Sequence, residues 1–369
     1  MRFIAISLMV LVGCGDNSPD GDDGPEDHDV SAGIDPGGAN VGKLLPRVCA
    51  ARQWSTPFVE DKNLQLRVVP VTQGTAVLGV PLAGGQVYGF IVDPRGQIVG
   101  DPAGTRVLDG TFTNLSVSRQ DGRVVAALVE DGKTQIRAFK QDLSENHLLD
   151  TVGGDQLVAD TTMIKTRGQR MTISAGTDGI ITTPFDLQWA SLGAAVFAAD
   201  APISITSTEY GDDAMIAWST EHQCTVARVA AKRTMHEDFA CANNRIAADY
   251  SARRAQMVYE AGPDIHIADV SAGNHFEIAS HRMIAPHARS PRIVFDGDRY
   301  WISYLNARGE VTVGYLDDDR HIVSMGLTGV QPMAQAYDLA VIDGAVWVYA
   351  LDGISGYTGT QMCLERDAT

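Results

Sequence analysis

The chain has 369 residues, with 29 lysines and arginines against 46 aspartates and glutamates, and its formal net charge at pH 7 is −17. This sign argues against a protein that uses charge to hold nucleic acid or an anionic lipid surface, because both would be repelled. No apolar run reaches the roughly 18 residues that a membrane-spanning helix needs. We therefore predict a protein without nucleic-acid partners or transmembrane helices.

The first 14 residues have the features of a secretion signal. Arg2 is followed by an apolar run from Phe3 to Val12, and residues 11–14 are Leu-Val-Gly-Cys. This tetrad resembles the lipobox of bacterial lipoproteins. The resemblance implies that residues 1–13 are a signal peptide and that lipid, such as palmitate, on Cys14 anchors the protein in the bacterial cell envelope, at a periplasmic or outer-membrane surface. The alternative is an ordinary secretory signal with a cysteine there by chance.

Residues 14–43 are predicted to form an acidic, disordered tether. Between Gly15 and Gly42 the chain has eight acidic residues and no lysine or arginine, so it has too little apolar surface to fold. Five residues also match the spacing of a calcium-binding loop: Asp16, Ser18, Asp20, Gly21 and Asp27. Because the last of these is not glutamate and two prolines stiffen the segment, a spacer is the preferred interpretation and calcium binding the alternative.

From Leu44 onwards, short apolar runs are separated by turns rich in glycine, aspartate and asparagine, which is typical of an all-β protein. A tight polar turn followed by an apolar strand recurs with a mean period of 45 residues between Gly74 and Gly344. The seven turns lie at Gly74, Gly122, Gly168, Gly211, Arg253–Arg254, Gly297 and Gly344. A period in the forties with four strands per unit is typical of β-propeller blades.

We therefore expect residues 44–369 to form a seven-bladed β-propeller of four-stranded antiparallel blades, with two packed β-sandwiches as the alternative. The best candidate for a helix is Leu187–Ala199. In the sixth unit, which extends from Pro291 to Tyr315, residues 295–301 are Phe-Asp-Gly-Asp-Arg-Tyr-Trp. This unit resembles the blades of bacterial propeller lipoproteins of unassigned role, and the resemblance implies a fold but no activity.

The four cysteines after the lipobox are an even number, as expected for disulfides in an exported protein. Cys224 and Cys241 are predicted to lie on the third and fourth strands of the fourth unit. The last unit supplies only three strands, so we expect Arg47–Trp54 to add its outer strand, which closes the ring and places Cys49 opposite Cys363. The predicted disulfides are Cys49–Cys363 and Cys224–Cys241, and four buried free thiols are the alternative.

The sequence contains no recognisable catalytic motif, and we predict no catalytic residue, cofactor or metal site. Its one histidine-rich segment has four members that could ligate a metal: His266, His275, His281 and His287. Arginines at 282 and 289 lie among them, which favours ordinary surface histidines.

The preferred function is that of a monomeric, membrane-anchored binding or scaffolding lipoprotein that presents the propeller to a protein or glycan partner. The alternative is a hydrolase or lyase with its active site in the central channel, where side chains from several blades could meet.

Overall fold

The structure is a computed structural model that describes residues 44–54, 64–101, 104–166, 169–198, 201–221, 223–229, 233–237, 241–272, 276–317, 321–352 and 356–366. Cys14, the signal segment, the acidic tether and its calcium-loop pattern lie outside these residues. All described residues belong to one compact unit, Asn40–Thr369. Its regular secondary structure consists of β-strands alone, so the all-β expectation is confirmed. Within the described ranges, no helix is long and apolar enough to cross a membrane.

Four sheets have the same plan, in which four consecutive antiparallel strands pair in chain order. Their strands are β10 (Val158–Lys165), β11 (Arg170–Gly176), β12 (Gly179–Phe185) and β13 (Ala195–Ala198); β14 (Ser204–Tyr210), β15 (Asp213–Ser219), β16 (Cys224–Arg228) and β17 (Arg233–Glu237); β18 (Ala242–Asp249), β19 (Arg254–Ala261), β20 (Asp264–Ala272) and β21 (Phe276–Ala285); and β22 (Arg289–Phe295), β23 (Tyr300–Leu305), β24 (Val311–Leu316) and β25 (Ile322–Leu327).

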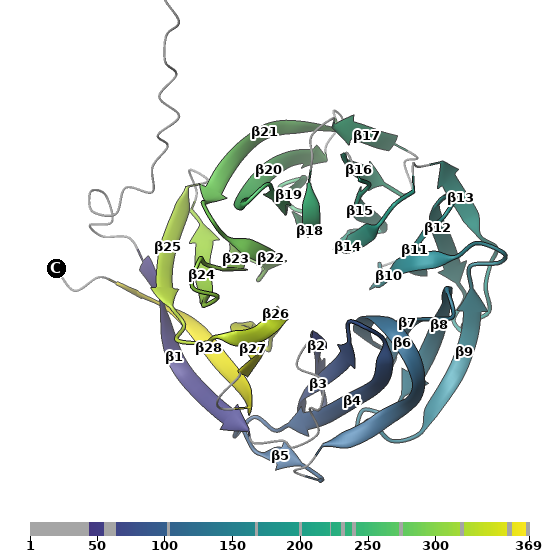
Figure 1. Ribbon diagram of the computed structural model, residues 1–369, viewed down its shortest axis with the longest axis horizontal. Helices are drawn as coiled ribbons and strands as arrows, with labels where there is room; N and C mark the ends of the chain where they lie inside the picture. Colours follow the sequence, from purple (N-terminus) through teal and green to yellow (C-terminus); the bar gives the residue numbers. More distant parts are fainter. Residues whose placement is uncertain are drawn as a thin grey trace, which may run out of the picture. The chain divides into compact units, whose positions relative to one another are not determined.

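A fifth four-stranded sheet joins the two ends of the described chain, in the order β1-β28-β27-β26. Its strands are β1 (Leu44–Trp54), β26 (Pro332–Ile342), β27 (Ala345–Asp352) and β28 (Gly356–Arg366). β1 is antiparallel to β28, with Leu44 opposite Arg366 and Trp54 opposite Tyr357. The outer strand of this sheet thus comes from the amino-terminal side of the chain, where the sequence predicts it (Figure 1).

The remaining sheet has eight strands: β2 (Leu64–Val71), β3 (Gly74–Pro81), β4 (Gly85–Val92), β5 (Ile98–Val99), β6 (Thr105–Gln120), β7 (Arg123–Glu130), β8 (Lys133–Phe139) and β9 (Asn146–Val152). The first part of β6 pairs with β4 and its second part with β7, and the buried Phe112 lies opposite both Gly85 and Glu130. The prediction of separate four-stranded units is therefore wrong here. Gly110 has a φ of +152°, which lets the strand change direction without a loop.

The sheets follow one another around a common centre, with the first strand of each unit innermost (Figure 1). Each innermost strand contacts the next, in the order β2, β6, β10, β14, β18, β22 and β26, and β26 in turn contacts β2. The second strands of the units, such as β11 and β15, are buried along their whole length, because neighbouring sheets cover both faces. The apolar core therefore lies between adjacent sheets.

The prediction of a helix at Leu187–Ala199 is wrong. Residues 187–188 form a turn, and the strand β13 follows at Ala195–Ala198. Leu187 and Leu192 are 77% and 61% exposed while Trp189 packs against the core, so the segment lacks the continuous apolar face that a helix would bury.

The turn glycines Gly74 and Gly344 provide a matched pair for testing the fold. Both have positive φ, but a Cβ at Gly74 would lie 2.0 Å from the Val92 carbonyl oxygen, whereas a Cβ at Gly344 would meet no atom within 4 Å. We expect Gly344→Ala to cost about 1 kcal/mol of stability from backbone strain and Gly74→Ala to cost about 3 kcal/mol or more. Urea unfolding of both variants measures the difference, and equal midpoints would contradict the close approach of β3 to β4.

Candidate functional site

The innermost strands enclose a polar cavity of about 190 Å³, which we call the inner cavity. All seven of these strands, β2, β6, β10, β14, β18, β22 and β26, contribute to its lining. Five of the lining residues are charged: Arg67, Asp160, Arg245, Arg292 and Asp338. Three arginines and two aspartates give this lining a formal charge of +1 (3 − 2), whereas the whole chain carries −17.

The alternation of side chains along each strand places these residues in the cavity. In β2, Leu64, Leu66 and Val68 are buried in the core, while Gln65 and Arg67 point to the opposite side and line the cavity. Four of the innermost strands carry a single charged residue at the cavity in the same way: β10, β18, β22 and β26.

The two aspartates are held by hydrogen bonds that join neighbouring innermost strands. Asp160 accepts hydrogen bonds from the amides of Thr161 and Ile205, both at 2.8 Å, and from the side-chain amide of Asn114. Asp338 accepts one from the amide of Val68 at 3.2 Å. Burial raises the pKa of the Asp160 carboxyl above its usual value, although these hydrogen bonds and the nearby arginines oppose the shift. The carboxylates therefore serve first as acceptors for strand amides.

The three arginines retain many donors. Each guanidinium has five N–H groups, and within the described ranges these make only main-chain hydrogen bonds. Arg67 donates to the Leu66 carbonyl at 2.8 Å, Arg245 to that of Asn244 at 2.6 Å, and Arg292 to that of Pro291 at 2.9 Å and, more weakly, to that of Ser290 at 3.5 Å. The buried Arg292 Nε makes no hydrogen bond and lies 3.9 Å from Asp338 Oδ1.

Burial and mutual repulsion both destabilise the charged form of the Arg67 and Arg245 guanidinium groups. Burial lowers the pKa of Arg245 to about 9, and repulsion from Arg292 and Arg67 adds to this effect. Burial also lowers the pKa of Arg67. The two carboxylates therefore only partly compensate three like charges in a small volume.

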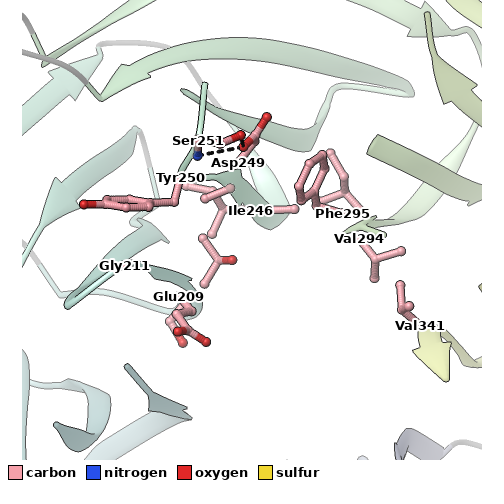
Figure 2. Close-up of a pocket in the computed structure, with 14 residues that line it drawn as sticks. Glu209, Gly211, Ile246, Asp249, Tyr250, Ser251, Val294, Phe295 and Val341 are labelled. Atoms are coloured by element: carbon pink, nitrogen blue, oxygen red, sulfur yellow. Dashed lines mark hydrogen bonds between the residues drawn. The ribbon is translucent and has the colours of Figure 1, made fainter. Parts of the chain in front are cut away.

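A wider cavity of about 690 Å³, the outer cavity, adjoins the inner one, and the two share Ser207, Ile246 and Ile293 as lining residues. Figure 2 shows Glu209, Asp249 and the ring of Phe295 at separate places around this cavity. Asp249 accepts hydrogen bonds from the amide and hydroxyl of Ser251 at 2.9 and 2.6 Å, which fixes the turn after β18. Carboxylates, hydroxyls and aromatic rings thus line this cavity.

The aromatic wall of the outer cavity depends on a turn glycine. Tyr250 packs edge-on against Tyr210 with 5.1 Å between ring centroids, and it is 50% exposed. A Cβ at Gly211 would lie 2.6 Å from the Tyr250 ring, so a larger residue there would displace this ring.

The structure pairs the four predicted cysteines in two disulfides. Cys49–Cys363 joins β1 to β28 with a Cα–Cα distance of 5.7 Å, and Cys224–Cys241 has a Cα–Cα distance of 5.8 Å. Cys241 does not lie on the fourth strand of its unit, as predicted: β17 ends at Glu237, and Cys241 directly precedes β18. This disulfide therefore ties one sheet to the start of the next, and both of its cysteines are buried in the apolar core between them.

Of the four histidines of the fifth unit, the structure describes His266, His281 and His287. His266 stacks on the Tyr259 ring and His281 Nδ1 lies 3.0 Å from the Tyr259 hydroxyl, whereas the His287 amide donates to Asp264 and His275 lies outside the described residues. Burial lowers the pKa of His266. In the part of the chain that the structure describes, no group of three histidine, cysteine, aspartate or glutamate residues could hold a metal ion.

The five charged residues of the inner cavity were missed at the level of sequence, although a signal was present. The repeats were aligned by their turns and second strands, while each charged residue lies on a first strand, five to eight residues before its turn. At residues 64–68, Leu-Gln-Leu-Arg-Val, a single charge inside an apolar strand marks one of these positions.

The sequence matches no protein-family model and no curated protein. Solved structures with the same fold include the WD40 domain of coronin from Toxoplasma gondii, with 11% identity, a TM-score of 0.59 and coverage of 89% of this chain and 88% of that one. BBS1N, solved in complex with ARL6DN, has 10% identity, a TM-score of 0.59 and coverage of 89% and 99%. Hydrazine synthase from Kuenenia stuttgartiensis has 11% identity, a TM-score of 0.58 and coverage of 85% and 99%. These similarities show a β-propeller-like fold and nothing about activity.

Proposed function

We propose that this protein is a binding or scaffolding lipoprotein, anchored in the bacterial envelope through Cys14, that receives a protein or glycan partner at the outer cavity of a seven-bladed propeller. The observation that carries this proposal is the pair of adjoining cavities at the centre of the sheets. The outer cavity, at about 690 Å³, lies within the roughly 300–1,000 Å³ of typical ligand sites.

The contacts of the innermost strands support seven blades. They run from β2 through β6, β10, β14, β18 and β22 to β26 and back to β2, which corresponds to one blade for each first strand. The pairing of β1 with β28 supports closure of the ring by the amino-terminal strand, with the Cys49–Cys363 disulfide as a covalent link. Closure would protect the edges that open sheets expose.

The lining of the outer cavity supports recognition of a hydroxyl-rich or basic group. Glu209 and Asp249 supply negative charge, Ser207 and Ser251 supply hydroxyls, and Phe295 supplies an apolar ring. Such a mixture suits the end of a neutral glycan or a basic peptide segment. Among structures with this fold, BBS1N was solved in complex with ARL6DN, an example of a propeller-like domain that binds a protein.

The alternative, a hydrolase or lyase with its site in the central channel, is favoured by one observation. Burial raises the pKa of Asp160 above its usual value, and a raised pKa is the direction that suits a carboxyl group to general-acid catalysis. Recovery of a bound glycan after prolonged incubation with the protein separates the two functions, because a binding protein returns it intact.

Photo-crosslinking in cells tests the proposal. A photo-reactive amino acid replaces Tyr250 at the outer cavity or, as the control, Leu148, which is similarly exposed (50% and 51%) but lies on β9. We expect a discrete adduct from position 250 in the membrane fraction, none from position 148, and loss of both the acyl label and the adduct in Cys14→Ala.

Protease and glycosidase treatment of the adduct tells a protein partner from a glycan. Equal adducts from positions 250 and 148, or an unmodified Cys14 in the mature protein, would contradict the proposed binding face or the anchor, respectively.

A further inference from the structure

We propose that the inner cavity binds a small oxyanion, a carboxylate or phosphate group, between the guanidinium groups of Arg67, Arg245 and Arg292. This inference rests on the proposed function, since it assigns a ligand class to the inner end of the same binding site.

The charge of the cavity calls for an anion. Its lining carries three positive and two negative formal charges inside a protein of charge −17, so the net charge of the lining is opposite in sign to that of the whole chain. An oxyanion would neutralise the excess, and in a poorly solvated cavity a charge-assisted hydrogen bond to a guanidinium is stronger than one in water.

The free hydrogen-bonding atoms match the same ligand class. Both aspartates already accept hydrogen bonds from strand amides, whereas the arginines keep most of their donors. Arg67 and Arg245 each direct one N–H to a main-chain carbonyl and keep four, and the buried Arg292 Nε has no hydrogen-bond partner in the described structure. The planar fork of a guanidinium fits the paired oxygens of a carboxylate or phosphate.

The cavity also has an unused acceptor and a limited size. Asn114 donates to Asp160 through its amide nitrogen, and its buried Oδ1 accepts nothing from any described residue. A ligand hydroxyl could donate to this oxygen, so an oxyanion that carries a hydroxyl, such as a hydroxy acid or a phosphate monoester, would satisfy donors and acceptor together. A volume of about 190 Å³ holds roughly six waters, which admits such a head group but not a whole sugar chain.

Isothermal titration calorimetry of the full chain with inorganic phosphate, and separately with acetate, tests this assignment. We expect at least one of the two to bind, and the stronger one shows whether the natural group is a phosphate or a carboxylate. Arg245→Gln is expected to weaken that binding at least tenfold, while Arg308→Gln, which removes an exposed arginine on the turn between β23 and β24, leaves it unchanged.

A second variant keeps the test decisive if Arg245→Gln does not fold. Asp338→Asn removes one negative charge but keeps an oxygen for the Val68 amide, so we expect anion binding to tighten at least threefold. No binding of either anion, equal binding in Arg245→Gln and wild type, or weaker binding in Asp338→Asn would overturn the assignment. If phosphate or acetate binds but position 250 gives no adduct, the proposed partner site at the outer cavity is wrong and the anion site stands. If position 250 gives an adduct but neither anion binds, only the anion site is wrong.

Discussion

Removal of the Cys49–Cys363 disulfide is expected to lower the thermal midpoint by about 9 °C, against about 4.5 °C for removal of Cys224–Cys241. The first disulfide closes a loop of 314 residues and the second a loop of 17. By lowering the chain entropy of the unfolded state, the two disulfides add about 6 and about 3 kcal/mol to the free energy of unfolding. For a domain of this size, the thermal midpoint changes by about 1.5 °C per kcal/mol.

The position of the long-range disulfide adds to this effect. β1 comes from the opposite end of the chain to the strands that it joins. Besides the disulfide, its contacts include pairing with β28, the packing of Trp54 and a hydrogen bond of 2.6 Å from the Tyr315 hydroxyl to the Leu44 carbonyl. The Trp54 ring stacks on Tyr349 at 6.0 Å and donates a hydrogen bond to the Gly96 carbonyl at 2.7 Å. Without the disulfide, only non-covalent contacts hold β1 to β28 and its other neighbours.

Calorimetric scans of Cys49→Ala/Cys363→Ala and Cys224→Ala/Cys241→Ala measure the two effects. Because Cys224 is fully buried, its replacement also leaves a small cavity. This cavity lowers the midpoint of the Cys224→Ala/Cys241→Ala variant further and brings the two midpoints closer together. Graded reduction of the unaltered protein avoids this problem, since Cys49 is exposed and should be reduced and alkylated first. A midpoint that does not fall as Cys49 becomes labelled would show that strand pairing alone holds β1.

The parts of the fold that depend on local sequence were predictable. Turn residues fix positive φ at positions such as Gly122, Gly211 and Gly344, so the turns could be located from the sequence and the repeat length derived from them. The continuity of β6 and the place of Cys241 were not predictable in this way. Both depend on how adjacent sheets meet, and no local turn or spacing in the sequence encodes that.

The candidate site was missed for a related physical reason. Arg67 and Arg292 are 225 residues apart in the sequence, and each alone resembles an exposed charge on a half-buried strand. Only the arrangement of β2, β10, β18, β22 and β26 around one cavity brings their charged side chains together. For such a protein, the charged positions of all first strands have to be considered together before a site becomes visible.

Asp160→Ala is expected to destabilise the protein by about 3–5 kcal/mol, and Arg245→Met is expected to restore part of this loss. Asp160 accepts hydrogen bonds from the amides of Thr161 and Ile205, and its removal leaves these two donors without an acceptor. It also leaves a single carboxylate beside the three arginines of the inner cavity. Removing a positive charge as well reduces the remaining repulsion. By the same argument, Arg245→Met alone should stabilise the protein by about 1–3 kcal/mol.

Urea unfolding of the two single variants and the double variant forms a double-mutant cycle that measures the coupling between Asp160 and Arg245. Asp155→Ala, at an exposed position between β9 and β10, is the control and should change stability by less than about 0.5 kcal/mol. Added phosphate or acetate should stabilise the wild type by binding to its folded state, and should not stabilise Arg245→Met, which lacks one of the binding arginines. A ligand-binding role would explain why the protein keeps an arginine that lowers its stability. Additive effects of the two substitutions would mean that the carboxylate holds the strands without compensating the arginines.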